Sequence, residues 1–337
     1  MKDRIRVAMI GAGDMANRVH YPSLKEMPDV EMVAACDLDA QCLHTTADKY
    51  QIEMRYTDYK RMLEEVAPDA VYIILPPLVL FPVVMHAANA GFHTFIEKPP
   101  ALTRFQARSM ALVAERKNLL TMVGFNRRFI PVLAAAKAKV EERGPIVHTI
   151  ATFYKNSVGH GPSQGGGIDL LTYDGIHAVD TLRGIGGEVE EVVSDVRCLF
   201  ADYENSFCAM MRFENGGLGI LTTSWAFGTR VHTFEMHGKG ISAFVDGNSE
   251  ARIYADQDKV YSASGSGGIA QTKAFVIGAD EAAGSSEFFK SYGYFAENQH
   301  FIQCLKEGKQ PQTNFADALK TMELCDRIYH SQRWLAS

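Results

Sequence analysis

Lys98 holds an unusual position, between an apolar run and two prolines in the stretch FIEKPP (95–100). A lysine at the carboxyl end of a buried parallel strand lies where ligands of such sheets bind. The prolines that follow restrict the backbone, so the amine is held in place. If a bound cofactor placed a positively charged ring beside the partly buried amine, the pKa of Lys98 would fall. The amine would then be suited to proton transfer. From position alone, a surface lysine paired with Glu97 is an equally good interpretation.

A second stretch, Gly11-Ala12-Gly13-Asp14-Met15-Ala16, has the pattern GxGxxA between an apolar run and a helix-length segment. In this pattern Gly11 permits a tight turn, Gly13 lets the backbone approach a pyrophosphate, and Ala16 allows close helix packing. The free N–H groups at the start of the helix then face the phosphates. The sequence therefore predicts a dinucleotide site, the alternative being a glycine-rich turn without a ligand.

Asp37 indicates which dinucleotide is bound. It ends the second apolar run, 24 residues after Gly13, where a carboxylate accepts hydrogen bonds from the adenosine ribose. Asp39 follows closely, and no Arg or Lys is adjacent. A phosphate on that ribose would meet a carboxylate, and the repulsion would cost up to about 4 kcal/mol for unit charges ~4 Å apart. NAD is therefore favoured and NADP is less expected, although Asp37 or Asp39 could instead cap the next helix.

The first third of the chain alternates two kinds of segment, which predicts a doubly wound parallel sheet. Short apolar runs typical of strands covered on both faces occupy residues 5–10, 31–36, 70–75, 93–96 and 119–125. Helix-length segments lie near residues 15–27, 39–50, 58–66, 79–90 and 103–117. Asp58 and Thr103 are expected N-caps.

After about residue 125 the pattern changes to longer strand-like runs separated by turn signals. Asn215-Gly216-Gly217 stands between two such runs and predicts a hairpin. This part is expected to be an α+β domain with a large, mainly antiparallel open sheet. A length of 337 residues agrees with two domains. We place the dinucleotide-binding Rossmann domain at 1–125 and a substrate-binding and oligomerisation domain at 126–337.

Composition limits the class of protein. A net charge of −6 argues against non-specific nucleic-acid binding, which needs a basic face. The six cysteines form no CxxC, so reduced thiols, a cytoplasmic location and no metal site are expected. The N-terminus does not read as a signal peptide. Residues 70–92 carry no formal charge over a membrane-spanning length, but three prolines interrupt them. A strand, a turn and a helix explain that stretch better, and no membrane partner is expected.

Taken together, the motifs resemble those of the glucose–fructose oxidoreductase / inositol dehydrogenase (Gfo/Idh/MocA) family. They are GAGDMA, IEKPPALT, GFNRRF (124–129), GGG…DGIHAVD and the closing FIQCLKEGKQPQTNFADALKTMELCDRIY, in the family's order from residue 5 to about 331. The resemblance implies a Rossmann domain followed by an α/β domain, whose open sheet commonly forms the oligomer interface. A homodimer or homotetramer is therefore expected.

The resemblance also implies roles for Lys98 and His177. Lys98 would contact the substrate hydroxyl beside the nicotinamide, and the Lys98–Pro99 bond is allowed to be cis. His177 would be the acid/base, for which an imidazole is suited near neutral pH. The family's pattern is DxGxH, but here Tyr173 stands four residues before His177 and Asp174 three before it. Both positions lie near the histidine on a helix. Asp174 is favoured as its electrostatic partner and Tyr173 as a hydrogen-bonding group for substrate.

A lone histidine in an amphipathic stretch is more often structural, and only the glycine-rich loop 159–167 and the resemblance favour chemistry at His177. Two further sets of residues are candidates. The expected cofactor-binding residues are Gly11, Gly13, Asp14, Met15, Asp37, Pro76, Glu97 and Lys98. The expected substrate-binding residues are Asn126, Arg127 and His160.

These residues favour an NAD-dependent oxidoreductase that acts on a secondary alcohol of a sugar, cyclitol or related polyol. His177 would accept the hydroxyl proton, and Lys98 would stabilise the developing alkoxide as hydride leaves. Two alternatives stay open. One is a lyase or glycosidase that retains NAD, oxidises the sugar transiently and eliminates a substituent. The other is a non-catalytic NAD-binding regulator on the same scaffold.

Overall fold

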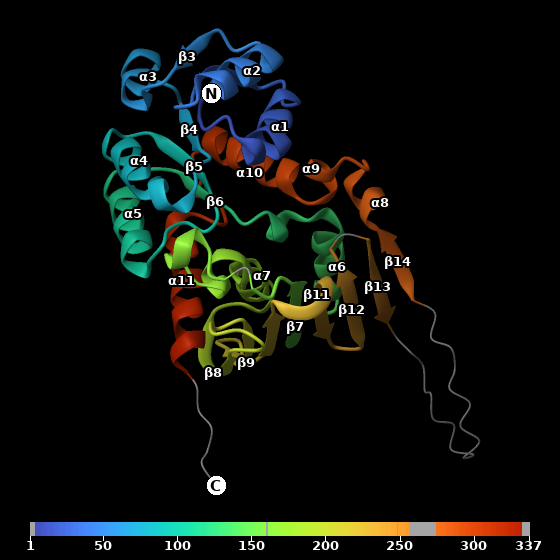
Figure 1. Cartoon of the computed structure of the whole chain (residues 1–337). Helices are drawn as coiled ribbons and strands as arrows, with labels where there is room; N and C mark the ends of the chain where they lie inside the picture. The colour runs from blue at the N-terminus through green and yellow to red at the C-terminus, as the bar shows by residue number, and fades with distance from the viewer. Residues whose placement is uncertain (1–3, 160, 248, 256–273, 332–337) are drawn as a thin grey trace, which may run out of the picture. The chain divides into compact units, whose positions relative to one another are not determined.

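The computed structural model describes residues 4–159, 161–247, 249–255 and 274–331 (Figure 1). The chain divides into two compact units. The first unit consists of Met1–Phe129, Pro162–Ile176 and Glu287–Asp326. The second unit consists of Ile130–Gly161, His177–Ser286 and Arg327–Ser337. Each unit contains one sheet.

The first unit contains a six-stranded sheet in the order β3-β2-β1-β4-β5-β6, and all of its pairs are parallel. Its strands are β1 (Ile5–Ile10), β2 (Val30–Cys36), β3 (Met54–Tyr56), β4 (Ala70–Ile73), β5 (His93–Glu97) and β6 (Thr121–Gly124). The strand order reverses at β1, which pairs with β2 on one side and β4 on the other. This arrangement is the predicted doubly wound fold, with its ligand-binding edge at the carboxyl ends of the strands.

Helices cover the faces of this sheet. They are α1 (Tyr21–Lys25), α2 (Ala40–Tyr50), α3 (Tyr59–Val66), α4 (Pro77–Asn89), α5 (Arg104–Arg116), α9 (Phe288–Ser291) and α10 (Tyr294–Glu307). Shorter helical turns are η1 (Ala16–His20), η2 (Asn126–Phe129), η3 (Gln164–Gly166) and η4 (Leu171–Gly175). Helices α4 and α5 lie side by side, and α10, from the C-terminal third of the chain, packs on α1 (Figure 1).

The predicted N-caps are confirmed. The Asp58 side chain accepts hydrogen bonds from the N–H groups of Lys60 and Arg61, and the Thr103 hydroxyl accepts one from Gln106. These caps satisfy N–H groups that have no partner within their own helices. The uncharged stretch 70–92 forms β4 and α4, as expected. Among the described residues, no helix combines the length and the apolarity that crossing a membrane requires.

Two elements differ from the prediction. The segment 15–27 is not one regular helix, because it begins as the π-helical turn η1 and continues as α1. Pro22, near the start of α1, has no N–H to donate, which interrupts a regular α-helical ladder at this point. The edge strand β3 was not predicted, since its three residues contain a polar Arg55 and form no apolar run.

Aromatic side chains form the core beneath β4 and β5. The rings of Tyr72 and Phe95 stack with centroids 4.6 Å apart, and Phe301 of α10 contacts both rings. All three side chains are fully buried. Because Phe95 precedes Glu97 by two residues on β5, this packing fixes the strand that leads to Lys98.

The second unit contains an eight-stranded sheet in the order β14-β13-β12-β11-β7-β10-β9-β8. Its strands are β7 (His148–Asn156), β8 (Val189–Arg197), β9 (Ser206–Phe213), β10 (Leu218–Ser224), β11 (Ala226–Gly238), β12 (Ile241–Asp246), β13 (Glu250–Ala255) and β14 (Phe275–Gly278). Its helices are α6 (Pro131–Glu141) and α8 (Ala279–Ala283). Helices α7 (Ile176–Gly186) and α11 (Phe315–His330) begin in the first unit and end in the second.

The mainly antiparallel prediction for this sheet is confirmed, with one exception. The pair β7–β10 is parallel, and these strands are too far apart in the sequence for a turn signal to indicate their pairing. The predicted hairpin joins β9 to β10, where Gly216 has a φ of +83° and the Gly217 N–H donates to the Asn215 side chain at 2.8 Å. A glycine suits the left-handed backbone at Gly216.

Phe95→Ala should lower the free energy of unfolding by about 3–5 kcal/mol, because it opens a cavity in a close-packed core. Phe95→Leu should cost less, since it keeps most of the volume. Urea unfolding measures both variants. The assignment of Phe95 to the core of the first unit is wrong if Phe95→Ala costs no more than Leu112→Ala, which truncates a side chain that is 40% exposed on α5.

Candidate cofactor and active site

The glycine-rich turn follows β1 at the carboxyl edge of the first unit's sheet. Gly11 has a φ of +110°, and a Cβ there would lie 2.2 Å from the carbonyl oxygen of Ile74. Both the backbone conformation and the contact exclude any larger residue. The turn is thus pressed against the residue that follows β4, and the Ile74 N–H donates to the Ile10 carbonyl at 2.8 Å.

Gly13 differs from Gly11, because no atom lies within 4 Å of the position that its Cβ would occupy. The missing side chain therefore leaves open space above the turn. Asp14 is exposed and Met15 is half-buried. Residues at the start of a helix have no preceding carbonyl to bond, so their N–H groups are available to an anion. The space at Gly13 and these donors fit the pyrophosphate of a dinucleotide.

Asp37 and Asp39 divide between them the two roles that the sequence left open. Asp39 caps α2, since its side chain accepts from the N–H groups of Gln41 and Cys42. Asp37 does not cap that helix. One of its oxygens accepts from the Ala12 N–H at 2.7 Å, and the other accepts from the Asp39 N–H at 2.9 Å. Asp37 therefore joins the end of β2 to the glycine turn, at the place where a ribose would lie.

Pro76 and Lys98 lie at the same edge of the sheet. Pro76 follows β4 and is the N-cap residue of α4, and Lys98 directly follows β5. The Lys98–Pro99 bond is cis. The Lys98 ammonium donates to the Tyr173 carbonyl at 3.2 Å and lies 5.2 Å from the centroid of the Tyr173 ring. The first unit thus brings together Lys98 and Tyr173, which are 75 residues apart in the sequence.

Tyr173 and Asp174 lie on the π-helical turn η4, and both side chains are half-buried. The turn is fixed by Asp169, whose carbonyl accepts from the Tyr173 N–H at 2.9 Å and whose side chain accepts from the Thr172 N–H at 2.7 Å. His177 follows one turn later and is the first residue of the second unit's middle segment, His177–Ser286. It is buried, and its carbonyl accepts from the Thr181 hydroxyl at 2.7 Å.

Asn126 and Arg127, the expected substrate-binding residues, are both buried. The Asn126 amide donates to the Tyr292 carbonyl at 2.8 Å. The Arg127 guanidinium donates to the Asn126 side chain at 3.3 Å and to the Tyr292 hydroxyl at 3.4 Å. These contacts join the segment after β6 to Tyr292, the C-cap residue of α9. The third expected residue, His160, lies outside the described residues.

The structure also reveals a buried polar cluster that the sequence analysis did not identify. It consists of His20, Glu97 and Glu297, whose nitrogen and oxygen atoms lie within 4.8 Å of one another. His20 and Glu297 are fully buried, and Glu97 is 8% exposed. In the sequence, Glu297 is a charged residue between Tyr294 and Phe301, and the structure places it on the buried face of α10. The spatial neighbours of Glu297 could not be inferred from the sequence.

By donor type the cluster could hold a metal ion, but its contacts do not require one. The His20 Nε2 and Glu97 Oε1 atoms are 3.0 Å apart, which is a direct hydrogen bond. Glu297 is a different case, because burial raises the pKa of its carboxyl well above the ordinary range. The negative charge of Glu97 raises this pKa further, and the positive charge of Arg127 opposes the shift.

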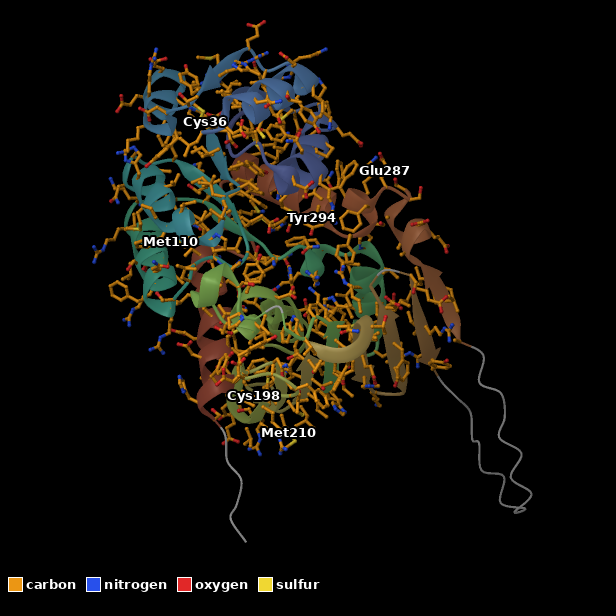
Figure 2. All side chains as sticks on the ribbon, in the orientation of Figure 1. Cys36, Met110, Cys198, Met210, Glu287 and Tyr294 are labelled. Atoms are coloured by element: carbon orange, nitrogen blue, oxygen red, sulfur yellow. The ribbon has the colours of Figure 1, made fainter. Side chains whose placement is uncertain are left out.

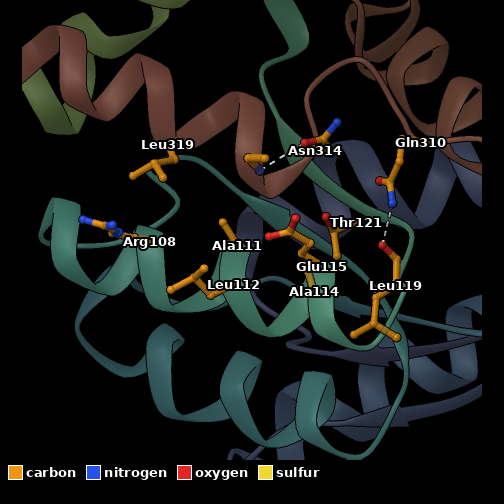
Figure 3. Close-up of a pocket in the computed structure, with 11 residues that line it drawn as sticks. Arg108, Ala111, Leu112, Ala114, Glu115, Leu119, Thr121, Gln310, Asn314 and Leu319 are labelled. Carbon is orange, nitrogen blue, oxygen red and sulfur yellow. Dashed lines mark hydrogen bonds between the residues drawn. The ribbon is translucent and has the colours of Figure 1, made fainter.

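A separate hollow of about 430 Å³ lies between α5 and the segment that leads to α11 (Figure 3). Gln310 crosses one end of it and donates to the Leu119 carbonyl at 2.8 Å (Figure 3). Its lining includes Thr121, the first residue of β6. This hollow is therefore at the amino edge of the sheet, opposite the edge that carries the glycine turn and Lys98.

The fold and the glycine turn define a class of dinucleotide-binding oxidoreductases. Residues 5–125 match the family model described as "Oxidoreductase family, NAD-binding Rossmann fold", and residues 137–243 match the model of the "GFO/IDH/MocA C-terminal domain". The chain belongs to the Gfo/Idh/MocA family. Its cofactor is NAD, and it is a dehydrogenase of this oxidoreductase family.

Known proteins agree with this assignment. The chain is 30% identical over 257 residues to the uncharacterized oxidoreductase YrbE of Bacillus subtilis, covering 71% of this chain and 73% of that protein. It is 29% identical over 255 residues to D-glucoside 3-dehydrogenase of Escherichia coli, covering 67% and 72%. The fold matches levoglucosan dehydrogenase in complex with NADH, with a TM-score of 0.82 and 21% identity over 97% of this chain and 96% of that one.

Gly13→Val should separate cofactor binding from folding. The space at Gly13 is open, so the fold should accept the side chain with little change in unfolding free energy. NAD affinity should fall by at least about tenfold, because the side chain would occupy the pyrophosphate's place. Calorimetric NAD titration and urea unfolding measure the two effects. Gly11→Ala is the contrasting variant, which should destabilise the protein itself. Unchanged NAD affinity in Gly13→Val would contradict the assignment of the turn.

Proposed function

We propose that this protein transfers hydride between NAD and a secondary alcohol of a sugar, cyclitol or related polyol. The observation that carries the proposal is the amine of Lys98, held beside Tyr173 at the same sheet edge as the glycine turn. The names of two relatives support a sugar substrate, since one is a D-glucoside 3-dehydrogenase and another is a levoglucosan dehydrogenase.

In this proposal Lys98 and His177 act on the same hydroxyl. The Lys98 ammonium donates a hydrogen bond to the reacting oxygen and stabilises the negative charge that develops there. The His177 imidazole accepts the hydroxyl proton. Bound NAD supplies the acceptor for the hydride. Residues 126–337 supply the rest of the substrate site and the subunit contacts.

Tyr173 and Asp174 would place the other groups of the substrate. The Tyr173 carbonyl already holds the Lys98 amine at 3.2 Å, so the tyrosine determines where that amine points. Its hydroxyl would then bond to a second substrate hydroxyl. Asp174, three residues before His177, would stabilise the imidazolium after proton transfer. Asn126 and Arg127 are proposed to contact substrate from the end of β6, and the role proposed for His160 rests on sequence alone.

The proposal also includes an oligomer formed through one face of the second unit's sheet. In the strand register, one outward-facing row runs through Val193, Met210, Ile220 and Ile150 on β8, β9, β10 and β7. Val193 is 42% exposed and Met210 is 55% exposed. Met210 is labelled in Figure 2. Helix α6 packs on the opposite face, as the contact of Gly238 with Val140 indicates. An apolar row on an uncovered sheet face suits contact with a second copy.

Incubation with NAD and a panel of sugars and cyclitols, with NADH absorbance and mass spectrometry recorded together, tests the reaction. Production of NADH with a ketone product supports it. Loss of a substituent without net NADH would instead show the lyase or glycosidase. NAD binding without turnover of any member of a broad panel would support the alternative of a non-catalytic NAD-binding regulator.

Lys98→Met should lower kcat by about 10²–10³-fold, the loss typical of removing one donor to a developing oxyanion. NAD affinity should change little, because the methionine keeps the length of the side chain. Steady-state kinetics on the best substrate, with an independent NAD titration, measures both. Lys60→Met, on an exposed site of α3, is the matched control. The proposed role of Lys98 fails if its variant keeps the turnover of that control.

Met210→Glu should weaken the oligomer, because it places a charge in the centre of the apolar row. Size-exclusion chromatography with light scattering should show a lower mass for this variant than for the unmodified protein. Leu112→Glu, which adds the same charge at an exposed apolar site on α5, should leave the mass unchanged. A monomeric unmodified protein, or a Met210→Glu variant of full oligomeric mass, would refute this interface.

A further inference from the structure

The buried cluster of His20, Glu97 and Glu297 adjoins the residue on which the proposed chemistry depends. Glu97 is the last residue of β5, and its carboxylate makes two contacts. One oxygen is 3.0 Å from His20 Nε2, and the other accepts the backbone N–H of Lys98 at 3.0 Å. Glu97 therefore connects a histidine from η1 to the backbone of Lys98. Any change in the charge of Glu97 acts directly on the position of that lysine.

The hydrogen bonds around His20 fit a neutral imidazole, with the Asn298 amide at one ring nitrogen and Glu97 at the other. Its Nδ1 atom is 3.2 Å from the Asn298 amide nitrogen and 3.4 Å from the amide oxygen. The amide nitrogen also donates to the Tyr294 carbonyl at 2.7 Å, which sets the orientation of the amide. We assign Nδ1 as the acceptor from the nearer amide nitrogen of Asn298, and Nε2–H as the donor to Glu97. Glu97 is then the anion of the pair.

Glu297 faces this pair from α10 and is fully buried. No described residue hydrogen-bonds to either of its carboxyl oxygens. Two charges act on the Glu297 carboxyl: that of Glu97, at the end of β5, and that of Arg127, in the segment after β6. The charge of Glu297 also acts on Tyr72 and Tyr294, whose pKa values are raised mainly by burial and then by the nearby glutamates. Their hydroxyls are therefore neutral.

Two adjacent buried carboxylates with one facing guanidinium do not both ionise at low cost. Glu97 has two hydrogen-bond donors that stabilise its charge, whereas Glu297 has none among the described residues. The proton therefore belongs on Glu297. The cluster then has one negative charge at Glu97, one positive charge at Arg127, and a neutral His20.

We propose that Glu297 is a positioning residue for the active site, which stays a neutral carboxylic acid so that Glu97 remains an anion anchored to His20 and to the Lys98 N–H. This role rests on the proposed function, because it matters through Lys98. Ionisation of Glu297 in alkaline solution would place a second negative charge beside Glu97. Repulsion would then disturb the carboxylate that fixes Lys98 at the sheet edge.

The proposal predicts a specific pH dependence of stability. A carboxyl whose pKa is raised in the folded state binds its proton more tightly there than in the unfolded chain. Unfolding free energy is therefore lost as pH rises above the ordinary glutamate pKa, up to the raised pKa of the folded state. Glu297→Gln has no proton to lose. Its stability relative to the unmodified protein should rise steadily with pH over this window.

The experiment compares the full-length protein with Glu297→Gln and with the control Glu307→Gln, which removes an exposed glutamate from the same helix. Infrared spectra at neutral pH should show the carbonyl band of a buried carboxylic acid in the unmodified protein and in the control, but not in Glu297→Gln. In [¹⁵N]lysine-labelled protein, the Lys98 amide resonance, identified by its loss in Lys98→Met, should shift at alkaline pH. That shift should be absent in Glu297→Gln.

With an active substrate, kcat of the unmodified protein should fall at alkaline pH, and this fall should be missing in Glu297→Gln. Glu97→Gln should lower kcat by at least about tenfold at all pH values, since it removes the anion that holds Lys98. A stoichiometric metal that is lost in Glu297→Gln, the absence of the acid band, or an unaltered Lys98 shift would overturn the proposal. The spectroscopic results do not need turnover, so they stand or fall separately from the proposed reaction.

Discussion

The position of β5 between β4 and β6 is the constraint on which the candidate site depends. Parallel ladders on both sides fix the register of this strand, and the buried stack of Tyr72 and Phe95 fixes it from below. The strand ends at the edge where β1 turns through Gly11 against Ile74. Lys98 therefore emerges beside a dinucleotide turn because of sheet topology, and the Tyr173 carbonyl then accepts a hydrogen bond from its amine.

The same topology explains why much of the first unit could be predicted from the sequence. Parallel strands buried on both faces give continuous apolar runs, and the caps at Asp58 and Thr103 use only neighbouring residues. The parts that were missed depend on more distant partners. Strand β3 exists because it extends the edge beside β2, and β7 pairs with β10 although about 60 residues separate them. Neither pairing leaves a local signal.

The candidate site also combines features that have a local sequence signal with features that depend on distant residues. The glycine pattern and the lysine before the prolines are local features, so the sequence indicated both. The separate roles of Asp37 and Asp39 are not local, because only the folded turn brings the Ala12 N–H to Asp37. His20 and Glu297 are 277 residues apart in the sequence and meet only because α10 packs on the segment η1–α1. A histidine and a glutamate in apolar stretches were the sole traces of that cluster.

A buried glutamate without a hydrogen-bond partner among the described residues is unfavourable for stability alone. A methionine of similar length would fill the same aromatic surroundings without the cost of desolvating a carboxyl group. While Glu297 holds its proton, it adds no second negative charge beside Glu97, and Glu97 can stay ionised. Active sites commonly accept such local costs to fix the charge and geometry of a reacting group. Here the cost falls on the core of the first unit, and the benefit falls on the backbone of Lys98, whose N–H donates to Glu97.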